Sequence, residues 1–72
     1  MNKELIDYIV NHQIENNEKD LELLNMQLEF YNKLLKNVNT KEEKEKYQKK
    51  IKDIIRRIDN KIIDISKLYN LD

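Results

Sequence analysis

Apolar residues recur at alternating intervals of three and four along most of this chain, on both sides of a polar break at residues 37–40. The series before the break consists of Val10, Ile14, Leu21, Leu24, Leu28, Tyr31, Leu35 and Val38. Asn17 stands where one further apolar residue is due. Such spacing aligns side chains on one side of an α-helix, as in coiled coils. The chain is therefore predicted to be all-α, a coiled-coil-like antiparallel hairpin of two helices.

The second half of the chain carries an apolar stripe on one narrow face, which is rich in isoleucine. Its members are Tyr47, Ile51, Ile54, Ile55, Ile58, Ile62, Ile65, Leu68 and Tyr69. Lys61 interrupts this stripe, and Ile63 and Leu71 fall outside it. Isoleucine is a modest helix former, but the stripe follows the helical period and not the alternation of a strand. A second helix is therefore predicted.

The boundaries of the two helices follow from local signals. Residues 40–43 read Thr-Lys-Glu-Glu, a capping-box pattern in which the Thr40 side chain accepts a hydrogen bond from the Glu43 amide. The 72 residues include neither glycine nor proline, so no residue forces a break elsewhere. The expected organisation is a single domain over residues 1–72, consisting of a helix over 3–37, a turn over 38–40 and a helix over 41–70.

Folding the chain back near residue 39 predicts which positions of the two helices meet. The two polar interruptions, Asn17 and Lys61, then share one layer, which can fix the register at some cost in stability. The other expected partners are Tyr31 with Tyr47, Leu24 with Ile54, Val10 with Leu68, and Tyr8 with Tyr69. The same register brings Glu29 near Lys49 and Lys50, and Glu22 near Arg56 and Arg57, so opposite charges are expected to lie close together.

Residues 12–20 form the weakest part of the first predicted helix, because Ile14 is the only aliphatic residue there. Asn17 can cap a new helix, with Asp20 three residues later. The alternative fold is therefore a monomeric three-helix bundle with a break near residues 15–18. That bundle would uncover the apolar residues at the end of the second helix, so a continuous first helix is favoured.

The first helix carries a second apolar stripe beside the series that faces the second helix. Its members are Leu5, Ile9, Leu23, Met26, Phe30 and Leu34. A two-helix hairpin has a thin core, and contiguous apolar surface that stays exposed usually marks an interface. We therefore expect these six residues to form a protein interface, and the chain to be a homodimeric four-helix bundle.

The charges are balanced overall, with 14 basic and 14 acidic residues, but unevenly placed. Residues 1–32 are mainly acidic and residues 33–61 mainly basic, so the two helices are expected to neutralise each other. Nucleic-acid binding by Lys49, Lys52 and Arg56 is the alternative function, since a basic helix face can hold phosphates. Tyr47 is the only aromatic residue among these cations, which leaves no platform for stacking bases.

The composition offers little catalytic chemistry. The chain has no cysteine, no glycine and one histidine, which excludes disulfides and glycine-rich phosphate loops and disfavours a metal site. Ser66 is the only serine, and no histidine lies at a spacing typical of a catalytic triad. We therefore expect neither an enzyme nor a protein that binds a cofactor or metal.

The expected function is a non-enzymatic protein–protein interaction module, a small regulator or inhibitor that docks on a larger protein through an apolar helix face. A purely structural coiled-coil adaptor is a further alternative. Abundant Asn, Lys and Ile without any Ala, Gly or Pro indicate AT-rich coding, as in a low-GC bacterium, a phage or a mobile element. The sequence shows neither a signal peptide nor a membrane-spanning apolar run, so a cytoplasmic protein without membrane contact is expected.

Overall fold

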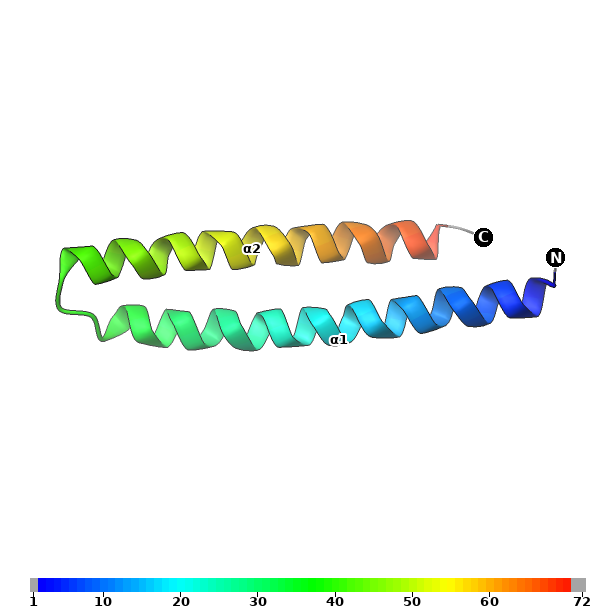
Figure 1. The fold of residues 1–72 in the computed structure, drawn as a ribbon, viewed down its shortest axis with the longest axis horizontal. Helices are drawn as coiled ribbons and strands as arrows, with labels where there is room; N and C mark the ends of the chain where they lie inside the picture. Colours follow the sequence, from blue (N-terminus) through cyan, green and yellow to red (C-terminus); the bar gives the residue numbers. More distant parts are fainter. Residues whose placement is uncertain (1, 71–72) are drawn as a thin grey trace.

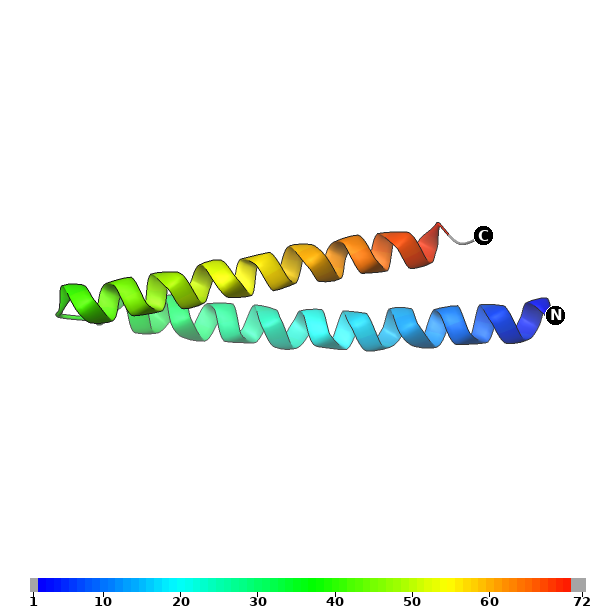
Figure 2. The ribbon, with the colours of Figure 1, turned by 45° about the horizontal axis from the view of Figure 1, so that its top comes forward.

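The computed structural model describes residues 2–70 and contains two long antiparallel helices (Figure 1). Helix α1 spans Lys3–Lys36 and helix α2 spans Lys41–Tyr69. They lie side by side in a rod 58 Å long and 14 by 11 Å across, diverging slightly toward the open end (Figure 2). The predicted helical hairpin is confirmed, and each helix ends one residue earlier than expected.

Helix α1 runs without a break through Asn16 and Asn17, so the alternative three-helix bundle is wrong. Two residues of the polar segment 12–20 face α2 and anchor this segment to it. Ile14 is buried, and Asn17 accepts a hydrogen bond from Lys61 of α2. The helix therefore continues because both inward positions of this segment have partners.

Side chains cap both helices and shape the link between them. Thr40 Oγ1 accepts a hydrogen bond from the Glu43 amide at 3.2 Å, as predicted, and Asn2 Oδ1 accepts one from the Glu4 amide at 3.0 Å. At the end of α1, the Asn37 side chain donates to the Lys33 carbonyl at 3.2 Å. None of the described residues has a positive φ, so the chain turns without needing glycine.

The core is one narrow seam between the helices. Ile14 and Ile54 are the most buried residues in the described part of the chain, with 7% and 3% of their surface exposed. Half-buried residues continue the seam: Val10, Asn17, Leu21, Leu24, Leu28, Tyr31, Leu35, Val38, Tyr47, Ile51, Ile58, Lys61, Ile65 and Leu68. The rings of Tyr31 and Tyr47 meet with centroids 6.1 Å apart, which confirms that predicted pair.

Three residues predicted for the seam of α2 lie outside it. Ile55, Ile62 and Tyr69 are 44%, 48% and 60% exposed. Their seven-residue spacing places them in one row beside the seam, whose layers other residues of α2 already occupy. The prediction that these three residues share the narrow face of the seam is therefore wrong. Leu71, expected outside the stripe, falls beyond the described residues.

The predicted contact between Tyr8 and Tyr69 is wrong. Tyr8 stacks on His12, with ring centroids 6.2 Å apart, whereas the Tyr69 hydroxyl donates to a Glu18 carboxylate oxygen at 3.4 Å. Tyr8 is 68% exposed, so it packs along its own helix and not against α2.

Within residues 2–70, Glu22 and Glu29 form no ion pair with the basic residues of α2 that the register was expected to bring near them. Arg56 and Arg57 both bind Asp53 of their own helix, at 2.7 and 3.1 Å. Among the described residues, the ion pair between Lys61 and Asp20 alone connects the two helices. Pairs three or four residues apart form within a helix at little cost in side-chain ordering.

Candidate protein-docking surface

Helix α1 carries a second set of apolar side chains on the side turned away from α2. We call Leu5, Ile9, Leu23, Met26 and Phe30 the outer face of α1. Their exposed fractions are 54%, 47%, 57%, 65% and 58%. Because their spacing fits steps of three and four, they occupy one side of the helix. The hairpin therefore leaves these five apolar side chains largely uncovered.

Leu34, the sixth residue predicted for this surface, is half-buried. It follows Phe30 by one helical turn and directly precedes the seam residue Leu35. Its side chain therefore lies at the edge where the outer face meets the seam. Packing against the hairpin explains why it is less exposed than the other five.

The same side of α1 is polar between Ile9 and Leu23. The residues that continue the spacing there are His12, Asn16 and Lys19, and all three are exposed. The outer face is thus divided into a short apolar cluster near the N-terminus and a longer one in the second half of α1.

Phe30 is exposed but held by aromatic contacts that reach the seam. Its ring meets Tyr31 edge-on, with centroids 5.4 Å apart and planes at 76°. Tyr31 in turn contacts Tyr47 of α2. Edge-to-face contacts of this kind are favourable. A ring already held in this way loses less conformational freedom on binding, which suits an interface anchor.

Sequence reasoning missed the exposed apolar row on α2, which consists of Ile55, Ile62 and Tyr69. The Tyr69 hydroxyl reaches Glu18 across one side of the hairpin. Leu23 borders a groove of about 320 Å³ on the other side, with Arg57 and Lys61. The two exposed apolar rows therefore lie on different sides of the molecule. The sequence could have predicted this exposure, because the steps of three and four along α2 already supply one residue for each layer of the seam without these three.

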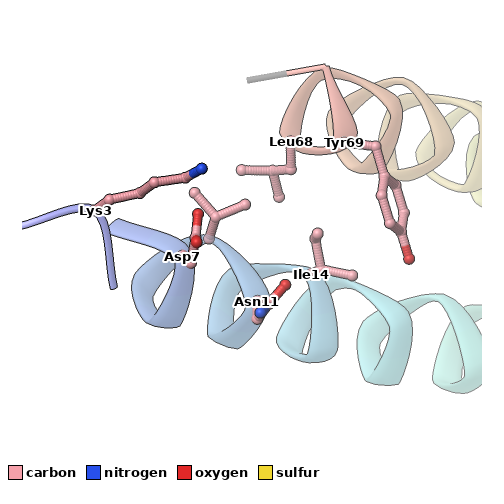
Figure 3. A pocket seen from close by; sticks show the side chains of 7 residues that line it. Lys3, Asp7, Asn11, Ile14, Leu68 and Tyr69 are labelled. Carbon is pink, nitrogen blue, oxygen red and sulfur yellow. The ribbon is translucent and has the colours of Figure 1, made fainter. Parts of the chain in front are cut away.

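The open end of the hairpin contains a groove of about 520 Å³ between the helices (Figure 3). Its lining consists of Lys3, Asp7, Val10, Asn11, Ile14, Leu68 and Tyr69. A lysine, an aspartate and an asparagine beside apolar and aromatic side chains are typical of a helix surface and not of a catalytic constellation.

The described residues offer neither a metal centre nor a membrane span. Nowhere among them do three or more His, Cys, Asp or Glu side chains gather as possible metal ligands. Neither described helix contains an apolar stretch sufficient to cross a bilayer.

The structure places Lys49, Lys52 and Arg56, the residues of the predicted alternative, on the exposed side of α2. Arg56 is bound to Asp53, which also binds Arg57. One carboxylate therefore offsets part of the positive charge at this end of the cluster. The surface is a mixture of charges and not a continuous basic track.

No protein-family model, curated protein or solved structure matches this chain. The inference of function therefore depends on the surfaces of the hairpin itself.

Proposed function

We propose that this protein is a non-enzymatic protein–protein interaction module that docks on a larger protein through the outer face of α1, as a small regulator or inhibitor. The observation that carries the proposal is the imbalance of apolar burial. Five large apolar side chains of the outer face are 47–65% exposed, while only two of the described residues, Ile14 and Ile54, are less than one tenth exposed. Covering such a surface is favourable, because apolar area leaves water.

The shape and composition of the surface also support docking. A straight helix with an apolar row on a rigid support can fit into a groove or pack against another helix. The cluster around Phe30 is bordered by the exposed acids Glu22 and Glu29. A central aromatic side chain with a polar rim is the usual composition of a binding hot spot.

Affinity capture tests this function. The wild-type protein and a Phe30→Glu variant are used as baits in a low-GC bacterial lysate, with and without nuclease. The matched control is Ile63→Glu, which places the same charge at a residue of α2 that is 50% exposed. We expect a protein captured by the wild type and the control but lost with Phe30→Glu, unaffected by nuclease. Capture that is independent of Phe30, or that nuclease abolishes, would contradict the proposal.

A further inference from the structure

We infer that a second copy of this chain covers the outer face, with the two α1 helices antiparallel and their midpoint between Asn17 and Glu18. The inference rests on the proposed function in one respect, that the outer face is a docking surface. It adds the identity of an occupant, the direction in which the occupant lies and the register in which it pairs.

The outer side of α1 carries a complete second series at alternating steps of four and three. Its members are Leu5, Ile9, His12, Asn16, Lys19, Leu23, Met26 and Phe30. Helices of coiled coils meet along such a series. Because α1 already uses its first series against α2, the helix has two seams, of which one is occupied by the hairpin and one is free.

Antiparallel pairing about this midpoint brings the two apolar clusters together. Leu5 of one copy lies opposite Phe30 of the second copy, and Ile9 lies opposite Met26. Two-fold symmetry repeats both pairings at the other end of the interface. The short cluster of each chain therefore covers part of the longer cluster of its partner.

The centre of the pairing is polar in both copies. Asn16 of one copy lies opposite Lys19 of the second copy, so the amide oxygen can accept a hydrogen bond from the ammonium group. Glu15 is the neighbour of Asn16 and lies beside the same ammonium group, which provides a carboxylate of opposite charge. The polar residues in the middle of one copy can therefore pair with the same polar residues of the second copy.

Charge also distinguishes this arrangement from a parallel one. In a parallel pair in register, Lys19 faces Lys19 and Lys33 faces Lys33, which are repulsive pairs of like charge. Sliding the antiparallel pair until Leu23 faces Met26 leaves Phe30 opposite Lys19. The register centred between Asn17 and Glu18 avoids both conflicts, and its one unlike pair is the uncharged contact of His12 with Leu23.

The exposed area is sufficient for an interface of ordinary size. A folded protein of 8.9 kDa ordinarily exposes about 4,800 Å². This chain exposes 6210 Å². The excess follows from the elongated rod, in which the side of each helix turned away from the seam stays uncovered. That uncovered surface leaves room for the roughly 800 Å² that each partner buries in a standard interface.

The resulting dimer differs from the compact four-helix bundle expected from the sequence. The two α1 helices lie in the middle and each α2 lies outside, because the outer face is turned away from α2. A larger protein that docks on the outer face then has to displace the second copy. Self-association and docking are therefore mutually exclusive.

Cysteine cross-linking tests the register, since the chain contains no cysteine of its own. Ile9→Cys and Met26→Cys are made separately, at exposed positions where the change leaves the hairpin seam intact. In a redox buffer, we expect a mixture of the two variants to form a disulfide-linked heterodimer. Each variant alone should remain largely unlinked, because identical positions lie about 25 Å apart along the pair. Ile63→Cys on α2 is the matched control and should not be linked to either variant.

Light scattering gives the second measurement. We expect about twice the chain mass of 8.9 kDa for the wild type and the single chain mass for Phe30→Glu. A monomer at all concentrations, or efficient linking of each cysteine variant to itself, would overturn the inference. In that case Phe30-dependent capture of a larger protein would still support the proposed function. Conversely, the expected cross-link without any captured protein would support the inference and count against the proposed function.

Discussion

The ammonium group of Lys61 lies 3.1 Å from Asn17 Oδ1 and 3.1 Å from Asp20 Oδ2, which places a polar layer within the apolar seam. The predicted neighbourhood of Asn17 and Lys61 is therefore confirmed. The Lys61 side chain remains 30% exposed, so water lowers the cost of holding its charge there. A slip of one heptad would move Lys61 against an apolar residue, either Val10 or Leu24. The layer therefore opposes changes of register.

Replacing both Asn17 and Lys61 with leucine should stabilise the hairpin by about 1 kcal/mol or more, because apolar contacts then replace a half-buried polar pair. Asp20 loses its partner but is exposed and stays solvated. Urea unfolding followed by circular dichroism measures the free energy of unfolding.

The single changes provide the control for this layer. Asn17→Leu and Lys61→Leu should each be less favourable than half of the double change, because each leaves the other polar group beside a leucine. Additive effects would show that the two side chains are energetically independent.

Ile54 and Ile55 are neighbours in sequence with opposite roles in the structure. Ile54→Ala should lower the free energy of unfolding by about 3 kcal/mol, because it opens a cavity in the narrow seam. Ile55→Ala should change the free energy by less than about 0.5 kcal/mol, since Ile55 is 44% exposed. Thermal and urea unfolding of both variants decide the matter. Equal losses would mean that Ile55 belongs to the seam after all.

The architecture could be predicted because the seam is regular. Steps of three and four on both sides of residues 37–40 determine two helices, and the paired faults at Asn17 and Lys61 determine their register. The Thr40 cap is a local signal that needs no knowledge of the fold. These features depend on residues close in sequence or on one repeated spacing.

Details at the edges of the seam were harder to predict. Ile55 and Leu34 each stand next to a seam residue, and the local twist of the helix pair decides which side chain is covered. Arg56 and Arg57 bind Asp53 because a partner one turn away is within reach whatever the other helix offers. Tyr8 stacks on His12, one turn along its own helix, and stays largely exposed.

Thr40 is the N-cap of α2, and the variant Thr40→Ala should cost about 1 kcal/mol of stability. The Glu43 amide would lose the hydroxyl that now accepts its hydrogen bond at 3.2 Å. Thr40→Ser keeps an oxygen in place and should cost much less. Urea titrations of the two variants measure the difference, and equal losses would assign the effect to the methyl group instead.

Nucleic acid should bind weakly at physiological salt. The 14 basic residues are balanced by 14 acidic ones, and Asp53 is already bound to two arginines of α2. Gel shifts with double- and single-stranded probes over a range of salt concentrations measure the affinity. Tight binding with a steep salt dependence, weakened by changes at Lys49, Lys52 and Arg56, would contradict this prediction and favour the nucleic-acid function.

Substitutions at Phe30 and Leu24 should have different effects, because Phe30 belongs to the outer face of α1 and Leu24 to the seam. Leu24→Glu should unfold the hairpin, because it places an unpaired carboxylate in the half-buried seam, at a cost of several kcal/mol. Phe30→Glu places the same group on a surface that is 58% exposed, so most of the helix content should remain at low temperature. The loss should appear instead in association, where buried aromatic anchors commonly contribute about 2 kcal/mol or more. Circular dichroism and light scattering on both variants distinguish the two effects. If both lost helix equally, Phe30 would be part of the stabilising core, and the outer face would no longer be a separate docking surface.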